Sequence, residues 1–156
     1  IGHVKNDLAL DDRYYGWAMA LFGIGAAIAA FAMGSLDKSK TRRTSLIGGA
    51  LLLGLSICFA NYVPYPVLLA FWMCAGLGQS LAEMPSETLI AEFIASPDQG
   101  KVYGSHFAFS HLWWAIAYPI AGVLGTMVPQ KEFLIGGLLT LGLACLAILV
   151  FRPTRL

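Results

Sequence analysis

One helical face near the end of an apolar segment carries the side chains best placed to do chemistry. Gln79, Glu83 and Glu87 recur every four residues, so on a helix they share one face. Glu83 lies a few residues from the end of the apolar run, which places it roughly 7–8 Å deep if the run crosses a bilayer. An ionised carboxylate at that depth is costly unless it meets water, a cation or a proton. We therefore expect Glu83 to bind a proton or to face a cationic substrate.

These carboxylates also have a structural interpretation. The ends of membrane helices commonly hold ion pairs, and Glu87 and Glu92 could pair with Arg42 and Arg43. For Glu92 we favour such an ion pair. For Glu83 and Glu87 the functional and the structural interpretations both stay open.

A second group of polar and aromatic residues follows in the next apolar segment, YGSHFAFSHLWWAIAYPIAG. One stripe at helical spacing comprises Tyr103, Phe107, His111, Trp114 and Tyr118. A neighbouring face holds His106, Ser110 and Trp113. His111 could relay protons or bind a transition metal together with Glu83, or it could be a neutral histidine bonded to another helix. The aromatic wall would suit a hydrophobic or cationic substrate.

The composition predicts the solvent in which these side chains are held. The chain has 156 residues, of which 58% are hydrophobic and 12% charged, and its mean hydropathy is +0.70. Soluble domains carry about a quarter charged residues, so a lipid bilayer is the expected surrounding. The net charge of +1 offers no basic excess for nucleic acid.

Five apolar runs are long enough to cross a bilayer as helices, which takes about 20 residues. They cover residues 14–36, 46–63, 66–90, 103–126 and 133–151. Their length and lack of alternation exclude strands, so residues 1–156 are expected to form one all-α transmembrane domain. In the first run Ala26, Ala30 and Gly34 form a ridge of small residues that would let another helix approach closely.

Short connections join the runs: DKSKTRR, VPYP, SPDQGK and VPQKE. Their basic residues predict the orientation, because cytoplasmic loops carry an excess of Lys and Arg. One side holds Lys38, Lys40, Arg42, Arg43, Lys101, Arg152 and Arg155, and the other holds Lys5, Arg13 and Lys131. This asymmetry predicts a cytoplasmic C-terminus. We expect an integral protein of a bacterial inner (plasma) membrane.

Two motifs carry a resemblance to the major facilitator superfamily. The stretch GSLDKSKTRR resembles the cytoplasmic loop motif of that family, with Gly34, Asp37, Arg42 and Arg43 at the matching positions. Residues 76–104 are similar to the family's cavity helix and the loop after it. The positions that fit there are Glu92, Pro97, Gly100, Lys101 and Gly104. The resemblance implies that Gly34, Asp37, Arg42, Arg43 and Glu92 form a cytoplasmic gate.

The resemblance also implies a fold and an activity. The resemblance implies a fold of two bundles with six helices each. Five spans would then be one of these bundles without its first helix, and the second bundle would be missing. Spans eight to twelve and spans two to six both fit, because the halves are repeats. The end of the chain shortly after Pro153, without a basic linker, favours the C-terminal half. The implied activity is secondary active transport by alternating access, with protons driving the efflux of a small molecule.

Other functions remain as alternatives. His106, His111 and Glu83 could support divalent metal-ion efflux, and a five-span chain could be a truncated scaffold that does not transport. A weak likeness of Pro119 and Gly122 to an antiporter motif adds little. An enzyme is not expected, because neither HExxH nor GxSxG occurs in the sequence. We expect no cofactor and no metal site, since Cys58, Cys74 and Cys145 lie singly within apolar runs.

Overall fold

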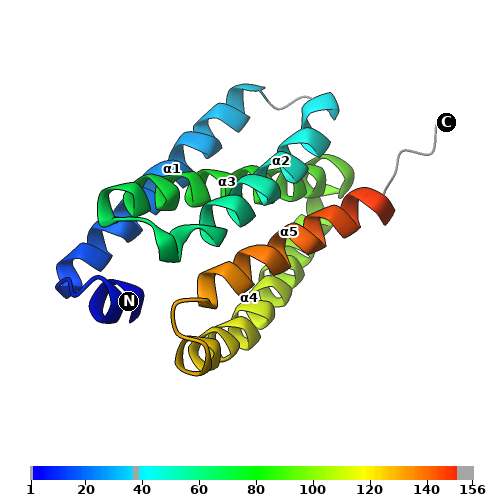
Figure 1. The fold of residues 1–156 in the computed structure, drawn as a ribbon. Helices are drawn as coiled ribbons and strands as arrows, with labels where there is room; N and C mark the ends of the chain where they lie inside the picture. The colour runs from blue at the N-terminus through cyan, green and yellow to red at the C-terminus, as the bar shows by residue number, and fades with distance from the viewer. Residues whose placement is uncertain (1, 37–38, 151–156) are drawn as a thin grey trace.

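The computed structural model of the chain describes residues 2–36 and 39–150, without the side chains of residues 36, 39 and 40. Its elements are a short helical turn η1 (His3–Asp7), α1 (Asp12–Leu36), α2 (Ser39–Cys58), a turn η2 (Ala60–Tyr62), α3 (Tyr65–Phe93), α4 (Ser96–Met127) and α5 (Glu132–Val150) (Figure 1). The five α-helices are all long and apolar enough to cross a membrane. The predicted all-α fold with five transmembrane helices is confirmed.

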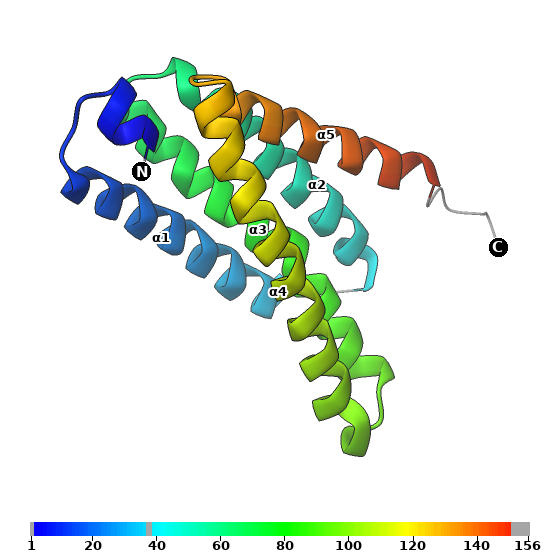
Figure 2. The same cartoon turned by 90° about the horizontal axis from the view of Figure 1, so that it is seen from below.

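Four of the helices form one layer, in which α1, α3 and α5 run in one direction and α2 runs in the opposite direction (Figure 2). α3 packs between α1 and α2, and α2 packs in turn against α5. α4 crosses one face of this layer and touches it mainly near its own two ends (Figure 2). Within α4, all of whose residues the structure describes, no residue is buried. The fourth helix is thus attached to the layer rather than packed into it.

Glycines make the contacts inside the layer. A Cβ atom added to Gly25 of α1 would collide with the carbonyl oxygen of Met73, and one added to Gly76 of α3 would collide with that of Phe22. α2 and α3 cross in the same way, since a Cβ atom on Gly78 would lie 2.7 Å from the carbonyl oxygen of Gly49. In lipid, such close backbone approach is a main source of helix association.

The predicted small-residue ridge of the first helix was wrong by one position. The residues that the fold buries on α1 include Gly25, Ala29 and Met33. Ala26 and Ala30 are half-buried beside them, and Gly34 is exposed. Each residue turns the helix by about 100°, so a one-residue error rotates the packing face. Two overlapping runs of small residues gave the sequence no means of choosing between these faces.

Two helices begin about seven residues earlier than the sequence predicted. α4 starts at Ser96, so SPDQGK forms its first turns instead of a connecting loop. Pro97 stands at the start of the helix, where its missing N–H costs nothing, and Asp98 in the first turn complements the helix dipole. α2 likewise starts at Ser39, which places Arg42 and Arg43 in its first turns. Helices can extend beyond the apolar span because their polar ends lie in water.

Candidate functional site: a polar groove between α3 and α4

A groove of about 430 Å³ lies between α3 and α4. Its lining consists of Glu83, Glu87, Tyr103, Gly104, His106, Phe107, Ser110, His111 and Trp114. Two carboxylates from α3 therefore face two imidazoles and an aromatic surface from α4. The structure brings together four of the side chains that the sequence placed on a transport path: Glu83, Glu87, His111 and Trp114.

The α3 wall contains a proline, and the fold compensates for it. Pro85 lies inside α3 and is buried, and it has no N–H to donate to the carbonyl oxygen of Leu81. The hydroxyl of Ser45 on α2 donates a hydrogen bond of 2.8 Å to that oxygen instead. The helix thereby passes the proline without leaving a buried acceptor unsatisfied. This bond joins α2 to α3 at Leu81, two residues before Glu83.

The α4 wall is a ladder of stacked rings. Phe107 stacks on His111 with a centroid separation of 3.8 Å, and His111 stacks on Trp114 at 5.2 Å. His111 Nδ1 lies 2.9 Å from the carbonyl oxygen of Phe107. A carbonyl oxygen only accepts, so this geometry requires a proton on Nδ1 and leaves Nε2 for a ligand or for a second proton.

Two contacts cross the groove, and both use Glu87. His106 Nδ1 lies 3.3 Å from Glu87 Oε1, and the two side chains are 36% and 37% exposed. The hydroxyl of Tyr103 donates a 3.0 Å hydrogen bond to the backbone carbonyl oxygen of Glu87. These polar contacts are what ties α4 to α3 beside the groove.

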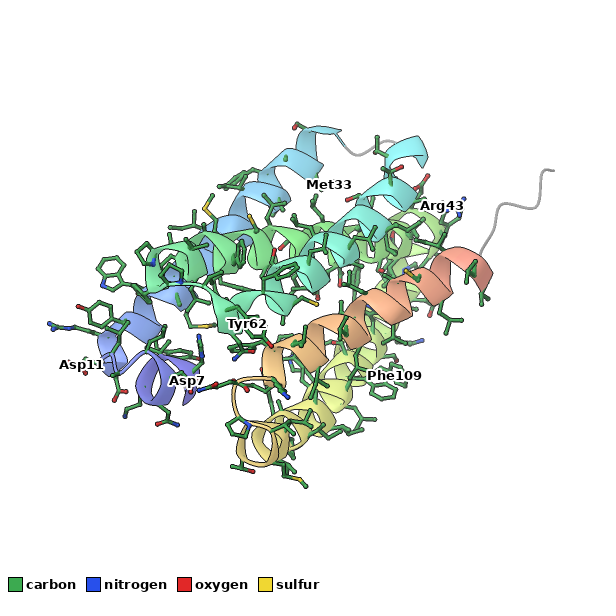
Figure 3. The ribbon with its side chains drawn as sticks, viewed as in Figure 1. Asp7, Asp11, Met33, Arg43, Tyr62 and Phe109 are labelled. Carbon is green, nitrogen blue, oxygen red and sulfur yellow. The ribbon has the colours of Figure 1, made fainter. Side chains whose placement is uncertain are left out.

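Sequence reasoning assigned His106 and Ser110 to a different face from the aromatic stripe, but both line the same groove. At 3.6 residues per turn, the lining residues of α4 span an arc of about 160°. His106 and His111 stand near opposite edges of that arc. The third residue of that face, Trp113, packs edge-on against Phe109, which projects outward from α4 in Figure 3. The signal that could have identified His106 was the prediction of carboxylates on the preceding helix, because a histidine of α4 can pair with a carboxylate that faces it.

Two of the predicted path residues lie outside the groove lining. Gln79 is half-buried on α3, one turn before Glu83. Tyr118 is 67% exposed, and its ring lies 6.1 Å from that of Trp114, so it continues the aromatic ladder beyond the groove.

Three of the predicted gate residues, Arg42, Arg43 and Glu92, lie at the end of the layer where α2 begins and α3 ends. Arg42 forms an ion pair with Glu92, as the sequence suggested, whereas Glu87 pairs with His106 instead. Arg43 follows on α2 (Figure 3). Gly34 is exposed near the end of α1, and Asp37 lies outside the described residues.

The comparison with protein families gives one match that covers residues 1–156, and that family is described as the Major Facilitator Superfamily. The chain belongs to the major facilitator superfamily. Members of this superfamily are membrane transporters, so the chain is an integral membrane protein of a transporter family. No curated protein and no solved structure gives a significant match to it. The assignment that its two sequence motifs suggested is confirmed.

Proposed function

We propose that this superfamily member forms part of a proton-coupled exporter of small molecules, with the groove between α3 and α4 on its transport path. The observation that carries the proposal is the meeting of Glu83 and Glu87 with His106 and His111 in one groove. Carboxylates within a membrane span mark ion and substrate pathways, because a bilayer penalises a charge that has no such role.

Glu87 and His106 are proposed to carry the proton. Their side-chain atoms lie 3.3 Å apart, so one proton can pass between a carboxylate and an imidazole. When both groups are protonated the attraction is lost, and α4 can move away from α3. Proton binding would thereby bias the two conformations of an alternating-access cycle.

Glu83 and the aromatic ladder are proposed to receive the substrate. Glu83 is an exposed carboxylate in the groove, and Phe107 and Trp114 offer ring faces beside it. A negative charge next to aromatic rings suits an organic cation, which gains both ionic and cation–π attraction. We therefore propose that the substrate is a lipophilic cation, and that protonation of Glu83 releases it.

The opposite wall of the path is proposed to come from further helices. α4 exposes large apolar side chains along its length, among them Trp113, Ile116 and Ile120. This pattern supports further helices beside α4, and we propose that the chain forms the last five spans of the C-terminal half of a twelve-span permease. The Arg42–Glu92 end, which also holds Lys101, would then be cytoplasmic in a bacterial inner membrane, as the basic residues predict.

Divalent metal-ion efflux remains the second candidate, because two histidines and two carboxylates share the groove. Their ligand atoms are not gathered around one point. Among the described residues, the one cluster of three such side chains with ligand atoms within 4.8 Å of one another lies elsewhere. This favours a cationic organic substrate over a metal ion in the groove.

The experiment uses inverted membrane vesicles that contain the full-length protein, an imposed proton gradient and the cationic dye ethidium. We expect gradient-dependent dye accumulation, which Glu83→Gln and Glu87→Gln abolish at unchanged protein level. Asp98→Asn is the control, since this carboxylate is exposed and bonds only within its own helix turn to Lys101.

Accumulation that persists in both glutamine variants would refute the proton and substrate roles. Gradient-driven uptake of Ni²⁺ or Zn²⁺ without dye transport would favour the metal candidate. Absence of any flux would favour the scaffold.

A further inference from the structure

A second cluster of titratable side chains lies at the opposite end of the layer from the Arg42–Glu92 pair. His3 and Asp7 come from η1, and Glu132 is the first residue of α5. One ligand atom from each of the three lies within 4.8 Å of the other two. The side chain of His3 is only 3% exposed, so its imidazole is removed from water. Asp7 is labelled in Figure 3 beside the start of the chain.

The hydrogen bonds of this cluster leave two buried atoms without partners. His3 Nδ1 bonds to Asp7 Oδ2 at 2.8 Å, and Gln130 donates to Asp7 Oδ1 at 3.4 Å. Asn61 donates to Glu132 Oε1 at 3.1 Å. His3 Nε2 and Glu132 Oε2 are both buried, and neither has a hydrogen-bond partner in the part of the chain that the structure describes. Buried polar atoms without partners are rare in proteins, and a bound ion is one arrangement that would satisfy both of them.

The protonation pattern makes His3 Nε2 suitable for a metal ion. A carboxylate oxygen accepts the proton of Nδ1, which fixes the tautomer and leaves the lone pair of Nε2 free. Carboxylate–imidazole pairs of this kind orient the histidine ligands of metal ions and raise their basicity. Asp7 therefore positions His3, in addition to bringing its own charge close.

The charges of the cluster indicate a divalent cation. Asp7 and Glu132 bring two carboxylates beside one imidazole, a ligand set that suits a doubly charged ion. Lys5, the basic residue of the same turn, bonds instead to Asp12. Mixed nitrogen and carboxylate ligands suit Zn²⁺ and the neighbouring transition metals rather than Ca²⁺ or Mg²⁺.

We propose that His3, Asp7 and Glu132 form a binding site for a divalent transition-metal ion of the Zn²⁺ type, with His3 Nε2 and Glu132 Oε2 as direct ligands. Ligand atoms around tetrahedral Zn²⁺ lie about 3.4 Å apart, so the site would close by an inward movement of the side chains, with water in the remaining coordination positions. The ion fastens η1 to the start of α5, and through Asn61 to the connection between α2 and α3. It acts as a structural clamp and is separate from the transport groove.

The test uses the full-length protein in lipid nanodiscs, purified with a tag that contains no histidine. Titration calorimetry with ZnCl₂ should show one tight site, and Co²⁺ should give the visible absorption of a protein-bound ion. His3→Gln and Glu132→Gln should each weaken Zn²⁺ binding by about 100-fold or more. That is the largest loss usually seen when a residue that only supports a metal ligand is replaced. Zn²⁺ should raise the melting temperature of the unaltered protein but not that of either variant.

Two controls make the test specific. Asp98→Asn removes an exposed carboxylate at the other end of the layer and should leave Zn²⁺ affinity unchanged. The double variant His106→Gln, His111→Gln removes the groove imidazoles and should also bind normally. Binding that disappears with the groove variant but survives in His3→Gln would overturn the proposal, as would the lack of a saturable site in the unaltered protein. If His3→Gln fails to fold, Glu132→Gln alone decides, because Asn61 can still bond to the amide.

Discussion

The helices of this chain meet through two kinds of interface. α1, α2, α3 and α5 approach one another so closely that glycines at the crossings admit no Cβ atom, whereas α4 meets α3 through polar side chains and buries no residue of its own. The glycine interfaces have one compatible arrangement, because backbone contacts backbone. The polar interface depends on a few hydrogen bonds and one ion pair, so it can separate and form again at modest cost.

The groove lies at the interface that can move. In the transport cycle proposed above, the layer is the rigid part and α4 the part that responds, and the titratable groups at their junction would allow a proton to shift the balance. The first three predictions below each compare a residue of the packed layer with a matched residue of α4.

The largest effect is expected at the glycine crossings. Gly76→Val should destabilise the protein by about 3 kcal/mol or more, because the added atoms collide with the backbone of Phe22. Gly122→Ala in α4 adds a methyl group where no atom lies within 4 Å, and its effect should stay within about 1 kcal/mol. Thermal unfolding in detergent measures both. Similar stability of the two variants would contradict the contrast between the interfaces.

Substitutions of two tryptophans should distinguish effects on stability from effects on transport. Trp72 is half-buried, and its ring packs 5.2 Å from that of Phe133, so Trp72→Ala should cost about 2–4 kcal/mol of unfolding free energy. Trp114 is 45% exposed in the groove, and Trp114→Ala should leave stability nearly unchanged while it weakens ethidium accumulation. Equal losses of stability would show that α4 is packed as firmly as the layer.

The hydrogen bond from Ser45 to the carbonyl oxygen that Pro85 leaves without a donor predicts that a second substitution restores stability. Ser45→Ala should cost about 1–2 kcal/mol, because it leaves the carbonyl oxygen of Leu81 without a donor. Adding Pro85→Ala should restore most of that loss, since the new backbone N–H can reach the same oxygen. Ser110→Ala is the control, because that hydroxyl bonds only within α4 and to the neighbouring His111. A double variant as unstable as Ser45→Ala would refute this account.

The Arg42–Glu92 ion pair should contribute little to stability. Glu92 is 49% exposed, so a double-mutant cycle with Arg42→Gln and Glu92→Gln should give a coupling of about 0.2–1 kcal/mol. Its effect on transport should be larger, because the resemblance to the superfamily's motifs assigns both residues to a cytoplasmic gate. A coupling energy well above that range would show that this ion pair belongs to the rigid contacts of the packed layer.

The smallest effect is expected at Lys5. Its hydrogen bond to Asp12 raises the pKa of the Lys5 ammonium above 10.5. A raised folded pKa means that the added stability is complete below pH 10.5 and is lost as the pH rises through the folded value. Unfolding midpoints of the unaltered protein and of Asp12→Asn should therefore differ slightly at pH 8 and converge above the raised pKa. A difference that grows with pH would contradict this sign.

The sequence by itself determined the class of the protein and most of its organisation. Long apolar runs can satisfy their backbone in lipid only as helices, so five spans and a membrane location followed directly. The spacing of Glu83 and Glu87 placed them on one face, and the motif around Arg42 indicated the superfamily. These features are local, because helical period and span length depend only on neighbouring residues.

Only the tertiary structure decided which faces meet. Nearly uniform apolar helices have no polar side to mark their packing face, so Gly25 rather than Ala26 lies at the crossing with α3. The pairing of Glu87 with His106 depends on where α4 crosses α3. The meeting of His3 with Glu132 joins opposite ends of the sequence. Such contacts arise from close packing between helices, which residue spacing along a single helix does not encode.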